Sequence, residues 1–136
     1  METTQTFYSA DEFANVEPPN FRGLGQHLIV DFFECKETPQ TAVQLEQLML
    51  QAAKIIEATV VTSSFHAFEP MGLSGVVVIA ESHLAAHTWP EHGTVCVDLF
   101  TCSQTMQSVR GVTFLFEALQ ASSMSVQTLV RADQSK

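Results

Sequence analysis

The sequence is poor in basic residues. Six lysines and arginines stand against 15 aspartates and glutamates, which gives a net charge of −9 over 136 residues. Proteins that bind nucleic acids depend on clustered lysine and arginine side chains to neutralise phosphates. The charge balance therefore argues against a nucleic-acid partner.

Long apolar runs are also missing. None approaches the roughly 20 residues that span a bilayer, and the opening METTQTFYSADEF lacks the basic and apolar regions of a secretory signal. We therefore expect a cytoplasmic protein without a membrane partner. Its three cysteines include no CxxC pair, so they should be reduced thiols and not a zinc ribbon or thioredoxin motif.

The remaining composition is that of one globular domain. Apolar residues make up 46% of the chain, and a chain of this length can bury its own core. Residues 1–22 are polar and contain Pro18 and Pro19, which predicts a loose N-terminal extension. The domain proper is expected over residues 23–136.

The order of apolar patterns predicts an α/β (α+β) fold. Runs rich in β-branched and aromatic residues predict strands at 25–36, 58–68, 75–81, 82–89, 94–102 and 126–132. Apolar residues at helical spacing predict helices at 40–57 and 106–119. We expect a two-layer sandwich, an antiparallel-rich sheet with both helices on one face. Because Gly75–Glu81 is apolar on both faces, the other sheet face is expected to meet a second subunit.

Reactive side chains concentrate in the run Ala80 to Cys102. It holds three of the five histidines, the only tryptophan and two of the three cysteines: His83, His87, His92, Trp89, Cys96 and Cys102. Histidines four residues apart can bind a metal from a helix, but this pattern is that of a strand. Cysteines are commonly buried apolar residues, and Ser82 lacks a GxSxG motif. Periodicity and composition do not choose a reaction.

The ordered motif is more specific than its parts. SGVVVIAESHLAAHTWPEHGTVCVDLFTC, Ser74 to Cys102, resembles the core of the short prokaryotic, pyruvoyl-dependent S-adenosylmethionine decarboxylases. The Glu-Ser-His, His-Thr-Trp-Pro-Glu and Phe-Thr-Cys elements occur in register. GQHLIVDFFEC at 25–35 and SSFHAFEPMGLSG at 63–75 are similar to the family's upstream segments.

The resemblance implies self-processing between Glu81 and Ser82, into a β chain of residues 1–81 and an α chain of residues 82–136. Ser82 would become a covalent pyruvoyl group, the cofactor, which forms a Schiff base with the substrate amine. The implied products are CO₂ and decarboxylated S-adenosylmethionine for spermidine synthesis. No metal is expected.

Further roles follow from the same motif match. His87 and Ser74 match residues that act in processing, and Cys102 matches the cysteine that returns a proton to the substrate. Phe68 matches a ring that stacks on adenine, and Glu91 a carboxylate that binds ribose. His83 and Cys96 are interpreted as structural neighbours.

His92 stands where the family usually has tyrosine, and the sequence offers no role for it. Ser103 replaces the family's glycine after the cysteine, and Thr94-Val95-Cys96 replaces a more usual Tyr-Ala-Ala. These departures bear on the shape of the substrate pocket.

Two alternatives remain open at this stage. A pyruvoyl-dependent enzyme could act on arginine or ornithine, or the chain could be an unprocessed, non-catalytic homologue. The resemblance also implies a homodimer that pairs sheet to sheet as an αββα sandwich, with the sites at the interface.

Overall fold

One antiparallel sheet organises the part of the chain that the structure describes. The computed structural model covers residues 6–16, 22–104 and 106–134. Within them, seven strands lie in the order β1-β7-β2-β6-β5-β4-β3, and every neighbouring pair is antiparallel. The strands are β1 (Thr6–Tyr8), β2 (Gly23–Phe33), β3 (Val60–Ala67), β4 (Leu73–Ile79), β5 (Ser82–Trp89), β6 (Thr94–Thr101) and β7 (Ser123–Asp133).

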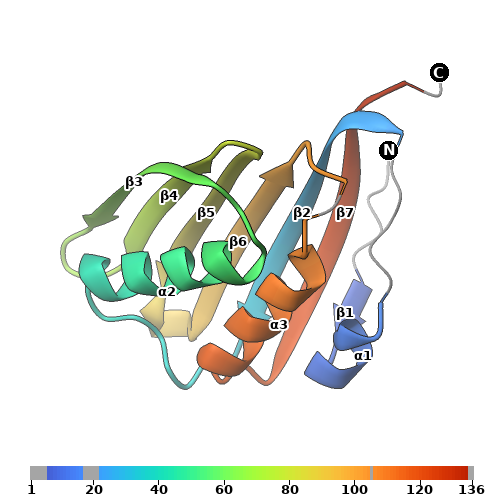
Figure 1. Cartoon of the computed structure of the whole chain (residues 1–136). Coiled ribbons are helices and arrows are strands. Elements are labelled where there is room, and N and C mark those ends of the chain that lie inside the picture. The colour runs from blue at the N-terminus through green and yellow to red at the C-terminus, as the bar shows by residue number, and fades with distance from the viewer. Residues whose placement is uncertain (1–5, 17–21, 105, 135–136) are drawn as a thin grey trace.

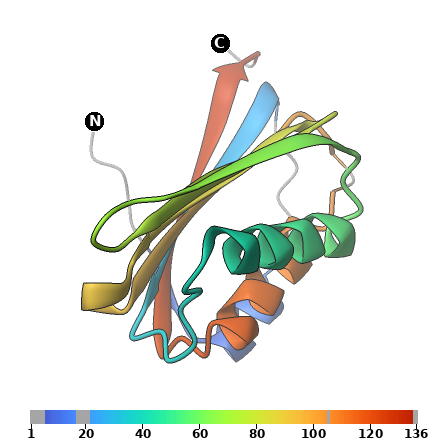
Figure 2. The same cartoon turned by 90° about the vertical axis from the view of Figure 1, so that its left-hand side faces the viewer.

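Three α-helices lie on one face of this sheet (Figures 1 and 2). They are α1 (Ala10–Ala14), α2 (Ala42–Ile55) and α3 (Ser108–Ala118), and a short 3₁₀ helix, η1 (Pro90–His92), links β5 to β6. The predicted two-layer sandwich is confirmed. We call the sheet face without helices the open face.

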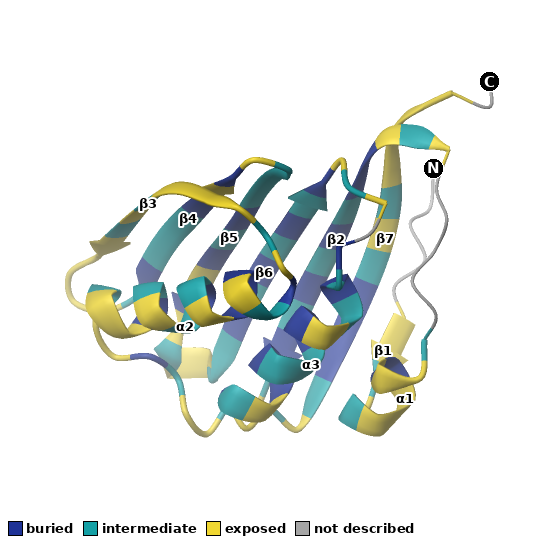
Figure 3. Ribbon diagram, viewed as in Figure 1, coloured by how far each residue is buried: buried dark blue, intermediate teal, exposed yellow. Residues whose placement is uncertain are grey.

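Alternation along the strands fills the space beneath the helices. In β2, Leu28, Val30 and Phe32 are buried, while the residues between them are only partly buried. The Phe32 ring meets Phe116 of α3 at 6.4 Å between centroids. Figure 3 shows this striped burial across the sheet. The core therefore lies between the helices and the sheet.

Element ends differ from the predictions by a few residues. Helix α2 begins at Ala42, later than expected, because the Thr41 side chain caps it by accepting from the Gln44 N–H at 3.1 Å. Strand β4 begins at Leu73, two residues before the predicted start at 75, because Leu73 already pairs with Ala67. The β4–β5 turn then falls on Ala80 and Glu81.

The prediction of a loose extension over residues 1–22 is wrong for residues 6–14. Strand β1 adds to the sheet beside β7, and α1 lies against α3. Phe13 is buried, and its ring meets Tyr8 edge-on at 5.3 Å. Two aromatic side chains thus anchor a segment whose average composition is polar. Residues 1–5 and 17–21 lie outside the described part.

Candidate functional site

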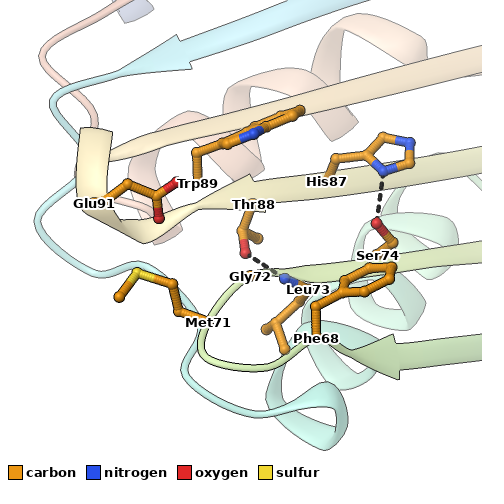
Figure 4. A pocket seen from close by; sticks show the side chains of 9 residues that line it. All are labelled: Phe68, Met71, Gly72, Leu73, Ser74, His87, Thr88, Trp89 and Glu91. Atoms are coloured by element: carbon orange, nitrogen blue, oxygen red, sulfur yellow. Dashed lines mark hydrogen bonds between the residues drawn. The ribbon is translucent and has the colours of Figure 1, made fainter.

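Ser74 and His87 form a hydrogen-bonded pair on the open face. They are directly opposite each other in the antiparallel register of β4 and β5. Ser74 Oγ and His87 Nδ1 are 2.8 Å apart (Figure 4). Since Nδ1 is engaged by the hydroxyl, Nε2 of the same ring is the nitrogen left to face a reacting group. The pair can therefore transfer a proton.

A cavity of about 290 Å³ opens beside this pair. Phe68 and Trp89 stand on opposite sides of it, with Glu91 and Met71 toward the η1 end (Figure 4). Phe68, Met71 and Trp89 are 51, 52 and 43% exposed. Two exposed aromatic rings and one carboxylate suit a flat ring system that carries hydroxyl groups.

Four residues expected to be functional line this cavity: Phe68, Ser74, His87 and Glu91. The sequence reasoning gave no role to Trp89 or Met71, which line it too. The signal for Trp89 was its spacing, because it lies two residues after His87 and so shares that strand face. His92 is exposed on η1, and its carbonyl accepts a hydrogen bond from Thr94 Oγ1 at 3.1 Å. It does not line the cavity.

A second group lies at the turn that joins β4 to β5. Ser82 has φ 143°, a backbone conformation that residues with a side chain rarely adopt. The carbonyl oxygen of Glu81 accepts a hydrogen bond from the Cys102 backbone N–H at 2.9 Å. A donor at this position stabilises negative charge that develops on the Glu81 oxygen. The backbone at Ser82 is therefore strained, and the Glu81 carbonyl is polarised by the hydrogen bond that it accepts.

The side chain of Glu81 is fixed as well. Its Oε1 accepts from the Thr59 backbone N–H at 3.0 Å, and the Ala80 N–H donates to the Thr59 carbonyl at 2.8 Å. Three hydrogen bonds thus hold the turn between β3 and the end of β6. Cys102 follows β6 directly and is exposed.

These two groups lie at opposite ends of the same hairpin. Ser82 pairs with Ile79 at the closed end, and His87 pairs with Ser74 toward the other end. Ser82 and His87 are five residue steps apart along the strand, which is about 17 Å at the usual rise per residue. Within one chain, the structure brings Ser82 together with Cys102 but not with His87.

Beside the processing turn and toward β2, the open face carries a cluster of rings and charges. His83 stacks on Phe100 at 5.6 Å, and His27 lies edge-on to both rings. His27 Nε2 is 3.6 Å from Asp98 Oδ1. Burial lowers the pKa of His83, and the nearby positive charge of His27 lowers it further, while Asp98 opposes the shift.

Two of the cysteines are poor nucleophiles by environment. Burial raises the pKa of Cys96 to about 12, and a hydrogen bond to Asp31 adds to the effect. Burial likewise raises the pKa of Cys35 to about 11, against a backbone hydrogen bond at Val95. Since the thiolate is the reactive form, both side chains fit a packing role.

Two kinds of feature are missing from the described residues. No group of three or more His, Cys, Asp or Glu side chains in residues 6–16, 22–104 and 106–134 could hold a metal ion. In the same ranges, no helix is long and apolar enough to cross a membrane.

Comparison with known proteins gives consistent matches. Curated relatives named S-adenosylmethionine decarboxylase proenzyme include one from Pseudomonas paraeruginosa, 50% identical over 97 residues, and one from Thermotoga petrophila, 49% identical over 106 residues. The alignments cover 71% and 77% of this chain, and 61% and 82% of the two relatives. The chain thus spans less than two thirds of the Pseudomonas protein.

A solved structure agrees with these matches. The crystal structure of the adenosylmethionine decarboxylase from Aquifex aeolicus superposes with a TM-score of 0.75 at 29% identity, covering 82% of this chain and 92% of the other. The family model described as S-adenosylmethionine decarboxylase matches residues 26–132. The resemblance seen in the motifs is confirmed: this chain belongs to the S-adenosylmethionine decarboxylase family.

Proposed function

We propose that the protein is a self-processing S-adenosylmethionine decarboxylase that cuts itself between Glu81 and Ser82. The observation that carries the proposal is the geometry of that bond. Ser82 has φ 143°, and the Glu81 carbonyl oxygen accepts a 2.9 Å hydrogen bond from the Cys102 N–H. Cleavage would release the strain, and the N–H would stabilise the oxyanion that forms on the way.

Processing would proceed through three balanced steps. The Ser82 hydroxyl attacks the Glu81 carbonyl carbon, the C–N bond breaks, and an ester with a free amine replaces the amide. Removal of the Ser82 Cα proton then expels the Glu81 carboxylate and leaves dehydroalanine. Water converts its enamine into a ketone and ammonia, so a pyruvoyl group begins the new chain. When present, this ketone supplies the electron sink for loss of CO₂ from an α-amino acid.

The Ser74–His87 pair suits the proton removal, but it must come from another chain. About 17 Å of strand separates it from Ser82 within one chain. A second copy of the chain can supply the Ser74–His87 pair if the open faces of the two chains pack together. The two-fold axis would then lie between the two sheets, perpendicular to the strands. The closed end of one hairpin then meets the open end of the other. We therefore propose a homodimer, an αββα sandwich with two shared sites.

The cavity beside that pair would bind the nucleoside part of the substrate. The Phe68 ring would stack on adenine, with Trp89 as the facing wall. The Glu91 carboxylate would accept hydrogen bonds from the ribose hydroxyls, as acidic residues do in other nucleotide sites. Cys102, exposed beside the processing turn, would return a proton to the substrate carbon after CO₂ leaves.

Complementation between two inactive chains tests the shared site. Ser82→Ala and His87→Ala chains, each with its own tag, are co-expressed, and the heterodimer is isolated. If the site is shared, the heterodimer holds one complete set, with Ser82 of the His87→Ala chain facing His87 of the other. We expect intact-mass measurement to find fragments 1–81 and 82–136 of the His87→Ala chain only.

Two results would contradict the proposal. Heterodimers that stay uncut would show that the two groups do not act across the interface. Fully processed wild-type protein that releases CO₂ from arginine or ornithine, and none from S-adenosylmethionine, would overturn the substrate. Each substrate is offered separately with a labelled carboxyl group, so the two failures are read independently.

A further inference from the structure

We propose that Thr88 is a positioning residue: its buried hydroxyl holds the loop of residues 68–72 against β5 and so sets the place of the Phe68 ring. This inference rests on the proposed function, in which Phe68 binds the nucleoside. Thr88 is among the residues that line the cavity, but its side chain is buried and its hydroxyl oxygen accepts a hydrogen bond from the loop backbone. It acts through the backbone of the loop.

Thr88 lies between two pocket residues but points the other way. His87 and Trp89 are on the open face, whereas Thr88 faces the helix layer and is only 4% exposed. Its Oγ1 accepts a hydrogen bond from the Leu73 backbone N–H at 3.0 Å, inside the buried layer (Figure 4). Leu73 is the first residue of β4, where the loop rejoins the sheet.

A second hydrogen bond carries this anchor to Phe68. The Phe68 backbone N–H donates to the Gly72 carbonyl at 2.8 Å, across the neck of the loop. Gly72 has φ 102°, which turns the chain so that its carbonyl faces Phe68 and the next N–H faces Thr88. Two consecutive hydrogen bonds therefore connect β5 to the backbone of Phe68.

Side-chain packing contributes little to holding this loop. Phe68 and Met71 are each about half exposed, and the ring contact of Phe68 is with His66, itself exposed, at 4.6 Å. Backbone hydrogen bonds consequently decide where the loop stands. Removing the Thr88 acceptor would leave a buried N–H without a partner, which costs more than the bond itself contributes.

This placement separates a positioning role from a merely structural one. Loss of a structural hydrogen bond lowers stability and leaves the KM for substrate as it was. Loss of a positioning bond displaces one wall of the pocket, so KM rises while kcat, which depends on Ser82 and Cys102, changes little. The change in KM compared with the change in kcat therefore distinguishes a positioning role of Thr88 from a structural one.

The test compares four variants of the full-length protein. Thr88→Val keeps the shape of the side chain and replaces the hydroxyl acceptor by a methyl group. Thr88→Ala removes the acceptor without adding that methyl group, and Thr88→Ser keeps the hydroxyl acceptor. Thr113→Val is the matched control, because Thr113 Oγ1 makes one hydrogen bond, to the Val109 carbonyl on α3, away from the loop. We measure KM and kcat for S-adenosylmethionine, and hydrogen exchange of the Leu73 amide by NMR.

We expect Thr88→Val and Thr88→Ala to raise KM about tenfold, the factor that one buried hydrogen bond commonly represents. Their kcat should stay within about twofold, Thr88→Ser should return KM to near the wild-type value, and Thr113→Val should change neither constant. Hydrogen exchange of the Leu73 amide should be about tenfold faster in Thr88→Val than in the wild type, and unchanged in Thr113→Val.

A wild-type KM in Thr88→Val, or a Thr88→Ser variant as weak as Thr88→Val, would overturn the inference. Unchanged Leu73 exchange would overturn it too, and that measurement needs no substrate. If the wild type itself shows no turnover of S-adenosylmethionine, the proposed function fails instead, and the exchange data alone decide whether Thr88 holds the loop.

Discussion

The two faces of the sheet carry different side chains although they belong to the same strands. In β6, Val95, Val97 and Leu99 are buried beneath the helices, while Cys96 and Asp98 alternate with them on the open face. In β5, buried Ala86 and Thr88 flank His87, which stands exposed beside the cavity. A step of one residue thus separates a packing position from a chemical one.

The two faces should therefore respond differently to substitution. Side chains under the helices are closely packed, so a substitution that changes side-chain volume there changes the stability of the fold. Positions on the open face keep polar groups that a filled core would penalise. Substitutions on the open face should therefore alter chemistry more than folding, and substitutions under the helices should do the reverse.

The largest expected effect is at Ser82. In Ser82→Ala the nucleophile is gone, so we expect the chain to remain whole after prolonged incubation, as judged by intact mass. Ser64→Ala, an exposed serine on β3, is the control and should cut normally. Efficient cutting of the Ser82→Ala chain would show that the cleavage site is elsewhere.

Next in size is Cys102→Ala. The substitution keeps the backbone N–H that contacts the Glu81 carbonyl, so processing should continue. Decarboxylation should fall about 100-fold or more, since a positioned proton donor contributes at least that factor. Cys96→Ala removes a thiol whose pKa is raised to about 12 and should keep most of the turnover. Equal activity of the two variants would remove Cys102 from the proton-donor role.

A change beneath the helices should act on stability alone. A methyl group at Gly111 of α3 would overlap with Ile56 Cγ2, which is buried where α3 approaches α2. We expect Gly111→Ala to lower the free energy of unfolding by about 1–3 kcal/mol, as overpacked cores do. Urea denaturation measures this, with Glu117→Ala, an exposed position on the same helix, as the control. Impaired self-cleavage in a folded Gly111→Ala protein would contradict the expectation that substitutions under the helices affect stability and not chemistry.

The smallest expected effect is a pH dependence at His83. Its folded pKa is lowered from 6.5, chiefly by burial, so the unfolded chain takes up the proton at a higher pH than the folded one. Stability is therefore lost as the pH falls from about 6.5 through the folded pKa, and none is lost above that range.

His83→Gln should flatten this loss, whereas the exposed His92→Gln should not. Urea midpoints at pH 7 and pH 5.5 give the comparison, with His27, Asp98 and Arg131 kept because they surround the same cluster. An identical pH response in wild type and His83→Gln would assign the dependence to another group.

Much of the fold could be predicted because it rests on local pattern. Apolar runs rich in β-branched and aromatic residues identified the long strands, and helical spacing identified α2 and α3. The exception was the N-terminal segment, where Phe7 stacks on Phe33 and Phe13 is buried. Its average composition is polar, and only contacts with distant strands reveal that a few aromatic residues hold it.

The candidate site was predictable as a set of residues but not as an arrangement. The motif pointed to Ser74, His87 and Glu91, which do line one cavity, and it grouped His87 with Ser82. The hairpin keeps that second pair apart, since its register places them toward opposite ends. The motif alone does not reveal this separation. Residues that are five steps apart in the sequence lie about 17 Å apart when the chain is an extended strand.

Which side chains share a face of a strand follows from the sequence alone, because alternation along a strand is a property of the backbone. The sequence also determines the chemical types available: one serine after a glutamate, a histidine, a cysteine and an acid. The hydrogen bond from the Cys102 N–H to the Glu81 carbonyl and the contact of Ser74 with His87 depend on the folded sheet. Those contacts join strands through sheet register, which is set by the packing of the whole domain rather than by neighbouring residues.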